Sequence, residues 1–130
     1  MFDEILTSII TLATTGTNLY SSIIVGSLPP DNGIACYLGP GAPISEDMRR
    51  GSVHELNVVF NAKNTDQQIC ISSLSAILRK LTLLVGFPHG DGWVIANIST
   101  GMTPEYTGQY ENNQWLYTAT FKVLVYLKGV

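Results

Sequence analysis

The stretch Trp115-Leu-Tyr-Thr-Ala-Thr-Phe-Lys-Val-Leu-Val-Tyr-Leu127 decides the fold, because its odd-numbered positions are all apolar. The even-numbered positions mix threonines and Lys122 with Leu124 and Tyr126. Alternation with period two, rich in β-branched and aromatic residues, is typical of a strand that buries one face. We therefore predict one long strand over residues 115–127, in a sheet with one fully buried face.

Residues 53–62 show the same alternation. Their even-numbered positions from His54 to Ala62 form a mostly apolar face, and Glu55 and Asn57 lie on the other. Further strands are expected at 20–28, 34–38 and 93–99, bounded by turns that contain proline and glycine. A polar connection over residues 103–114 then leads into the final strand.

Two segments have apolar residues at helical spacing. Residues 2–15 begin with Asp3 and Glu4, which are favourable near the positive end of a helix dipole. A second helix is expected to begin after Asn64 or Thr65, since either can cap a helix with glutamine three residues later. Its apolar stripe comprises Cys70, Leu74, Ile77, Leu78, Leu81 and Val85.

These elements predict an α+β fold. Strands joined by short polar connections pair antiparallel, so we expect a two-layer sandwich in which two helices pack on one face of a mainly antiparallel sheet. The expected order is α-β-β-β-α-β-β, in a single domain that covers residues 1–130. The odd face of 115–127, the even face of 54–62 and the stripe of the second helix should be mutually buried.

Residues 39–52 are expected to form a long loop, because glycines and prolines open it and no periodic pattern follows. It carries both signs of charge in Glu46, Asp47, Arg49 and Arg50. Long loops of this kind often make contacts with partners.

The composition excludes several classes of protein. Only 13% of residues are charged and the net charge is −3, whereas nucleic-acid-binding modules need clustered Lys and Arg. Cys36 and Cys70 lack metal spacing, so we expect small buried hydrophobes. The apolar run at 5–13 is too short to span a bilayer, and no export signal precedes it, so folding in the cytoplasm is expected.

No catalytic constellation is evident. His54 begins a strand on its apolar face, where a structural role is expected, and His89 lies two residues from Asp91 in a glycine-rich turn. No nucleophile elbow, phosphate-binding loop or metal-ligand set is present. We expect no enzyme, cofactor or metal, although a small hydrolase that uses His89 and Asp91 and a ligand-binding domain remain alternatives.

Two stretches resemble a known family. Leu28-Pro-Pro-Asp-Asn-Gly-Ile-Ala-Cys-Tyr-Leu-Gly-Pro-Gly-Ala-Pro43 is similar to the segment of siphophage minor capsid proteins in which a Pro-Asp turn leads into an Ile-Ala strand and a Pro/Gly loop. Pro104-Glu-Tyr-Thr-Gly108 followed by Gln114-Trp-Leu-Tyr117 resembles the closing strands of that family. The chain departs from the pattern at Asn112-Asn113, where glycine is preferred, and at Cys36.

That family is related to the tail terminators of long-tailed phages. The resemblance implies a virion protein, encoded by a phage or prophage and assembled in the host cytoplasm. It would form a ring, expected to be a hexamer, that ends tail-tube polymerisation and joins the tail to the head. Its partners would be copies of itself, the tail tube protein and the head connector or head-closure protein, with DNA passing through without sequence-specific binding. A head-closure or adaptor protein is the nearest alternative.

We expect the ring contacts at sheet edges and at the two polar segments 39–52 and 101–114. The candidate interface residues are Glu46, Asp47, Arg49, Arg50, Glu105, Tyr106, Tyr110 and Glu111.

Overall fold

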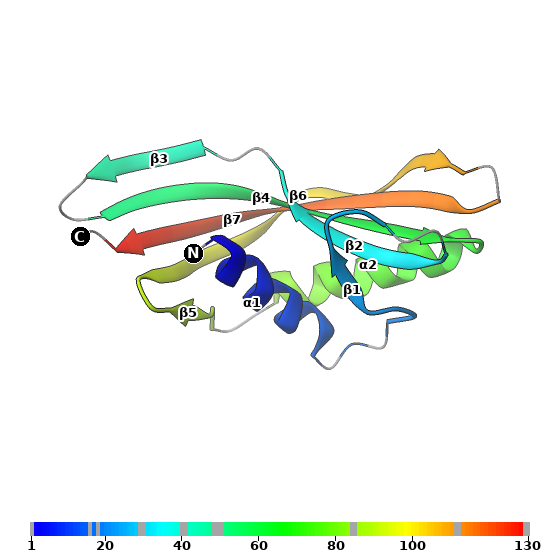
Figure 1. Cartoon of the computed structure of the whole chain (residues 1–130), viewed down its shortest axis with the longest axis horizontal. Helices are drawn as coiled ribbons and strands as arrows, with labels where there is room; N and C mark the ends of the chain where they lie inside the picture. The colour runs from blue at the N-terminus through cyan, green and yellow to red at the C-terminus, as the bar shows by residue number, and fades with distance from the viewer. Residues whose placement is uncertain are drawn as a thin grey trace.

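The computed structural model describes residues 2–15, 17, 19–28, 31–39, 42–47, 51–83, 86–110 and 113–128, with the backbone alone at 42–47. These residues form two helices and seven strands (Figure 1). In chain order they are α1 (Phe2–Thr14), β1 (Ile23–Val25), β2 (Gly33–Leu38), β3 (Ala42–Asp47), β4 (Gly51–Asn64), α2 (Gln67–Thr82), β5 (His89–Gly90), β6 (Trp93–Gln109) and β7 (Trp115–Lys128).

The strands form one sheet in the order β1-β2-β4-β7-β6-β5, and β3 pairs with the first part of β4. The last strand of the chain therefore lies in the middle of the sheet, between β4 and β6. Every strand pair is antiparallel except β1 and β2, which run parallel. The long final strand predicted from the sequence is confirmed.

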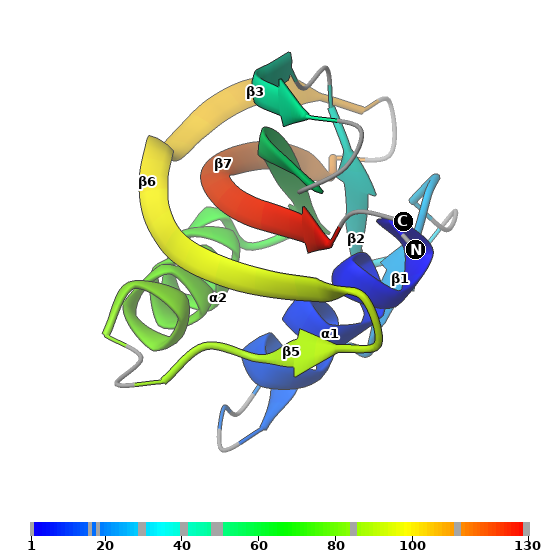
Figure 2. The ribbon, with the colours of Figure 1, turned by 90° about the vertical axis from the view of Figure 1, so that its left-hand side faces the viewer.

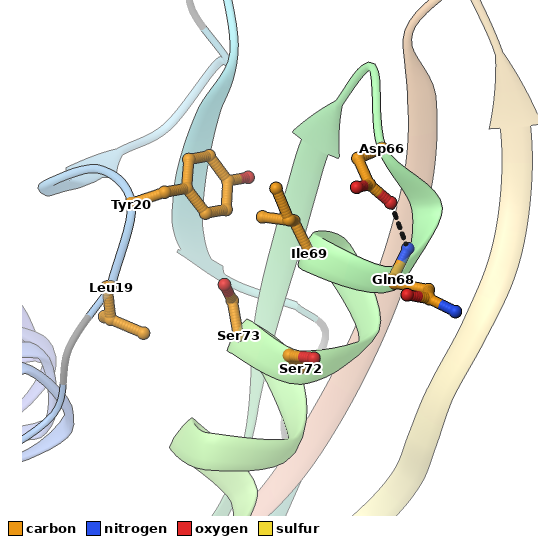
Figure 3. A pocket seen from close by; sticks show the side chains of 7 residues that line it. All are labelled: Leu19, Tyr20, Asp66, Gln68, Ile69, Ser72 and Ser73. Atoms are coloured by element: carbon orange, nitrogen blue, oxygen red, sulfur yellow. Dashed lines mark hydrogen bonds between the residues drawn. The ribbon is translucent and has the colours of Figure 1, made fainter.

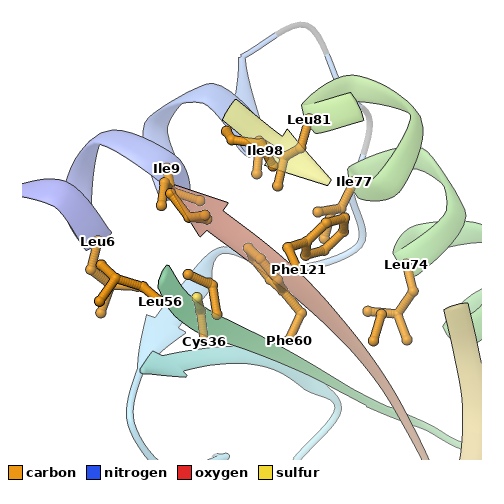
Figure 4. Close-up of a cluster of buried hydrophobic side chains, with 14 of the residues drawn as sticks. Leu6, Ile9, Cys36, Leu56, Phe60, Leu74, Ile77, Leu81, Ile98 and Phe121 are labelled. Carbon is orange, nitrogen blue, oxygen red and sulfur yellow. The ribbon is translucent and has the colours of Figure 1, made fainter. Parts of the chain in front are cut away.

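The register of β4 and β7 explains the core. Val58 lies opposite Phe121 and Phe60 lies opposite Ala119, so the even face of β4 and the odd face of β7 form one apolar surface. Phe60 and Phe121 meet edge to face, with ring centroids 5.5 Å apart. Side chains of both helices cover this surface (Figure 4). The predicted burial is confirmed for Leu74, Ile77, Leu81, Phe121, Val123 and Val125, whereas Leu78 is half-buried.

Helix α2 packs across β4, β7 and β6, and α1 lies against α2 and β2. The side chain of Asp66, not Asn64 or Thr65, caps α2 by accepting a hydrogen bond from the Gln68 amide at 2.9 Å. Asn64 is still part of β4, and its side chain accepts the Asp66 amide at 2.9 Å. The predicted cap was thus placed one or two residues too early.

The mixed α+β class is confirmed, but the predicted layout is wrong in several respects. The described order is α-β-β-β-β-α-β-β-β, because β3 and β5 were not expected. The sheet curls strongly, so two helices packed on one face of a two-layer sandwich is too simple a description (Figure 2). The loop expected at 39–52 contains β3, and the connection expected at 103–114 is mostly the second half of β6.

Candidate subunit interface

The candidate interface residues fall into two separate regions. Glu46 and Asp47 belong to β3, whose backbone pairs with the start of β4, while Arg49, Arg50 and Glu111 lie outside the described residues. Glu105, Tyr106 and Tyr110 lie at the β6–β7 hairpin. The two regions lie at opposite ends of the long axis of the molecule (Figure 1). The described parts of the two polar segments predicted to make contacts, 39–52 and 101–114, therefore lie on two separate surfaces.

The second region is a projecting hairpin, which we call the arm (residues 101–110 and 113–120). Its tip is closed by the Tyr110 amide, which donates to the Gln114 carbonyl at 2.7 Å, and by the Asn113 amide, which donates to the Tyr110 carbonyl at 3.2 Å. Asn113 adopts φ 62°, a left-handed conformation that asparagine tolerates better than most residues. Asn113 thus adopts a left-handed conformation in the turn where the family that this chain resembles prefers glycine.

Three aromatic rings lie on one side of the arm. The Tyr106 ring lies 6.1 Å from that of Trp115 and 5.8 Å from that of Tyr117, centroid to centroid. The Tyr117 hydroxyl donates to the Gln67 side-chain carbonyl at the start of α2, at 2.6 Å. Tyr106 itself is 50% exposed. Its outer half is therefore available to a partner while its inner half holds it in place.

Polar contacts fix the arm to the body of the subunit. Gln114 is almost fully buried and donates to the Asn32 side-chain oxygen at 2.7 Å. The Lys63 ammonium, also buried, lies 4.9 Å from the centroid of the Tyr110 ring, within the range of a cation–π contact. Breaking a buried polar contact costs free energy, because both groups are then left without a hydrogen-bond partner and without water. Such a contact therefore holds the side chains in one geometry. The base of the arm is therefore a pre-organised structure.

The outer side of β6 is a long but irregular edge. Beyond Val94, which pairs with β5, no described strand pairs with this side. Its pairing with β7 shifts register at four places between Ile95 and Gly108, and Pro104 lies within it. Bulges and proline are typical ways in which proteins prevent an edge from pairing indiscriminately.

The opposite edge of the sheet is β1. This short strand pairs only with β2 among the described strands, and two of its three residues are apolar and exposed, Ile24 at 41% and Val25 at 60%. Exposed apolar residues on an unpaired edge are a common feature of surfaces that meet other chains.

A pocket of about 430 Å³ lies between α2 and the segment that leads into β1 (Figure 3). We call it the α2 groove; it is lined by Leu19, Tyr20, Asp66, Gln68, Ile69, Ser72 and Ser73. Two of its polar groups have structural roles: the Asp66 carboxylate caps α2, and the Tyr20 hydroxyl lies 2.7 Å from the Gly33 carbonyl and 3.0 Å from that of Lys63. Burial raises the pKa of the Tyr20 phenol, so Tyr20 acts as a donor.

The remaining residues with reactive side chains are the two cysteines and the two histidines. Cys36 and Cys70 are free and buried, as predicted, and burial raises the pKa of their thiols to about 12 and about 11. The His54 ring contacts the Ser52 hydroxyl at 2.9 Å and the Phe2 ring. His89 is exposed on β5. Among the described residues, no three His, Cys, Asp or Glu side chains come together as a metal site, and no helix is long and apolar enough to cross a membrane.

Comparisons with known proteins give a structural likeness. No protein-family model and no curated protein matches the chain. Among solved structures, a chain from the virion of a native gene transfer agent particle is similar, with a TM-score of 0.50 and 13% sequence identity. The match covers 91% of this chain and 84% of that one. At this identity the likeness establishes a shared fold across nearly the whole of both chains.

Proposed function

We propose that this protein is a structural component of a phage-like virion, where it forms a ring at the head–tail junction and ends polymerisation of the tail tube. The observation that carries the proposal is the fold shared with a chain of a gene transfer agent virion, over most of both chains. The resemblance of residues 28–43 and 104–123 to siphophage minor capsid proteins points to the same class.

The shape of the subunit supports a role in assembly. A ring at a junction needs lateral contacts between copies and two different axial surfaces, one for the tube and one for the head. The arm and the β3–β4 hairpin supply distinct surfaces at opposite ends of the long axis. The proposed partners are copies of this chain, a tail tube protein and a head connector or head-closure protein, in a virion assembled in the host cytoplasm.

The low charge of the chain is compatible with a channel for DNA. With a net charge of −3, the subunit offers phosphates no excess of positive charge, so DNA would pass through without sticking. The proposal assigns the protein no catalytic role.

Deletion of the gene from the phage or prophage that carries it tests the proposal. Overlong tails without heads are the expected result, because nothing would stop tube growth. Tails of normal length beside filled, unjoined heads would assign the protein to head closure. Normal particles would contradict a role in the virion altogether. A point variant that still folds but does not assemble would control for polar effects of the deletion on neighbouring genes.

A further inference from the structure

We infer that the α2 groove binds an uncharged saccharide, with one sugar unit held between Tyr20 and the first two turns of α2. This inference goes beyond the proposed function and is independent of it, because it concerns a small ligand and not the contacts between subunits. The volume of the groove, about 430 Å³, lies towards the lower end of the range that is typical of small-molecule sites.

Ser73 provides the observation that carries the inference. This residue is only 7% exposed, and its hydroxyl forms no hydrogen bond with any described residue. Every side-chain nitrogen or oxygen that is sealed from solvent in the described part of the chain has a hydrogen-bond partner, so the Ser73 oxygen is open to the groove that it lines. Figure 3 shows this hydroxyl pointing toward the space between Tyr20 and Ile69.

A second hydroxyl on the same helix shows what Ser73 does not do. Thr82 donates to the Leu78 carbonyl at 2.7 Å, one turn earlier, which is the usual way for a hydroxyl to be satisfied within a helix. Ser73 makes no such bond to the carbonyl of Ile69. Its donor and its acceptor sites therefore remain available to a ligand in the groove.

The charges around the groove favour a neutral ligand. Among the described residues that line it, Asp66 alone is charged, and its carboxylate repels anions. The start of α2 carries the positive end of the helix dipole, which is unfavourable for cations. Because these two effects oppose each other, an uncharged ligand is the one that neither of them repels.

The polar groups of the groove match the hydroxyls of a sugar. Serine hydroxyls and the Gln68 amide can both donate and accept, whereas the Asp66 carboxylate accepts only. One oxygen of Asp66 accepts the Gln68 backbone amide at 2.9 Å, and the other lies on the side of Ile69 (Figure 3). A sugar hydroxyl both donates and accepts, so it can bind to each of these groups.

The apolar side of the groove selects a ligand with an apolar face. It consists of Leu19, the Tyr20 ring and Ile69, and the Tyr20 ring is fixed because its hydroxyl is held by two backbone carbonyls at 2.7 and 3.0 Å. A pyranose carries C–H groups on its faces and hydroxyls around its edge, so it meets both kinds of surface at once. A wholly apolar ligand would leave the Ser73 hydroxyl without a partner.

Titration of the isotope-labelled full chain with methyl glycosides, followed by NMR, tests the site. Methyl glucoside should shift the backbone amides of residues 19, 69 and 73 with a dissociation constant of about 1 mM, because a small ligand in a groove of this kind makes few contacts. The methyl glycosides of glucuronic acid and of glucosamine carry a charge on a sugar of similar size. They should bind about two- to fivefold more weakly. No shift at these amides with any neutral glycoside, or equal binding of the charged sugars, would overturn the inference.

Substitution of Ser73 tests the role of its hydroxyl. Ser73→Ala should weaken binding of methyl glucoside about two- to tenfold through loss of a hydrogen bond, and it should fold because alanine is favourable in helices. The matched control is Ser75→Ala, an exposed serine on α2 outside the groove, where binding should be unchanged. Equal affinities of these two variants would refute the site.

Substitution of Asp66 tests the electrostatic argument. Asp66→Asn removes the negative charge, and asparagine caps a helix about as well as aspartate does. The methyl glycoside of glucuronic acid should therefore bind this variant more tightly than it binds the unchanged protein. The absence of any gain would contradict the selection against anions by Asp66.

A neutral side chain of another protein is the competing occupant of the groove. N-acetyltyrosine amide and N-acetylglutamine amide present such side chains and can be titrated in the same way. Tighter binding of either compound than of every glycoside would assign the groove to a protein partner and overturn the saccharide. The deletion phenotype tests the proposed function separately, so failure of one inference leaves the other standing.

Discussion

Truncation of Phe121 is the most direct test of the core. Phe121 is fully buried, lies opposite Val58 on β4 and meets Phe60 edge to face at 5.5 Å (Figure 4). Phe121→Ala removes a large side chain from the centre of the sheet and leaves a cavity between β7 and α2. Such truncations cost about 3–5 kcal/mol. A domain of this size has a total free energy of unfolding of about 5–15 kcal/mol, so the variant should fold but be much less stable.

Urea denaturation at low protein concentration measures this loss, with the fluorescence of Trp93 and Trp115 as the signal. With an m-value of about 2 kcal/mol per M, a loss of about 4 kcal/mol moves the midpoint down by about 2 M. Phe121→Leu preserves most of the volume and should cost less than about 1.5 kcal/mol. Val94→Ala, at an exposed site, should change stability by no more than about 0.5 kcal/mol.

The register of β4 and β7 would be refuted if Phe121→Ala behaved like Val94→Ala. A double-mutant cycle with Phe60→Leu adds a second criterion. The two residues should show a coupling energy of about 0.5–1.5 kcal/mol, because their rings interact beyond the area they bury. Strict additivity would show that the rings do not touch in solution.

Three further predictions concern other parts of the fold. Asp66→Ala should lower the free energy of unfolding by about 0.5–2 kcal/mol through loss of the α2 cap, measured by urea denaturation, with Asp66→Asn as a control that retains most of the stability. Gly90→Ala should destabilise the β5–β6 turn, because the added Cβ would collide with the indole of Trp93. The collision would also disturb the 3.1 Å hydrogen bond that this indole donates to the Glu4 carboxylate. The control is Gly86→Ala, where an added Cβ meets no atom within 4 Å, and equal melting temperatures of the two variants would contradict the prediction. Stability should fall as the pH rises from about 9 towards 11–12, because the buried thiols, with pKa values of about 12 and about 11, keep their protons in the folded state and lose them on unfolding. In Cys36→Ala the urea midpoint should fall less between about pH 8 and about pH 10.5 than in the unchanged protein, and an equal fall in both would contradict the contribution of Cys36.

The strands that could be predicted from the sequence are those that bury one face in the core. Phe60 and Phe121 belong to strands whose alternation is dictated by burial, so their sequence carries the signal. The second half of β6 lies in the arm, where most of its residues are exposed. It therefore contains Thr103, Pro104 and Gln109 without alternation, and its pairing is set by its neighbour β7. Strand β3 is likewise held by pairing with β4 rather than by its own pattern.

The candidate interface was predictable only as a set of exposed residue types. Polar and aromatic residues in the segment 101–114 indicated a contact surface, but the sequence could not show that the Tyr106 ring packs against Trp115 and Tyr117. That packing depends on the register of β6 and β7, which shifts at four places. The anchoring of the arm by Asn32 and Gln114 joins residues that are far apart in the chain, so no local pattern announces it. The α2 cap was misplaced because Asn64, Thr65 and Asp66 are all residues that can cap a helix.

The central position of β7 constrains how the protein can be made. β7 is the last of the seven strands to leave the ribosome, yet β4 and β6 can join the same sheet only through it. During translation, β4 must therefore wait with an unpaired side until the residues up to 128 have emerged. The sheet can therefore be completed only after β7 has emerged, and it is dominated by contacts between residues distant in the chain, which slows folding and exposes the intermediate to aggregation. A nascent chain that stalls before residue 115 would lack the strand that joins β4 to β6, and its unpaired strands would be exposed to chaperones and proteases.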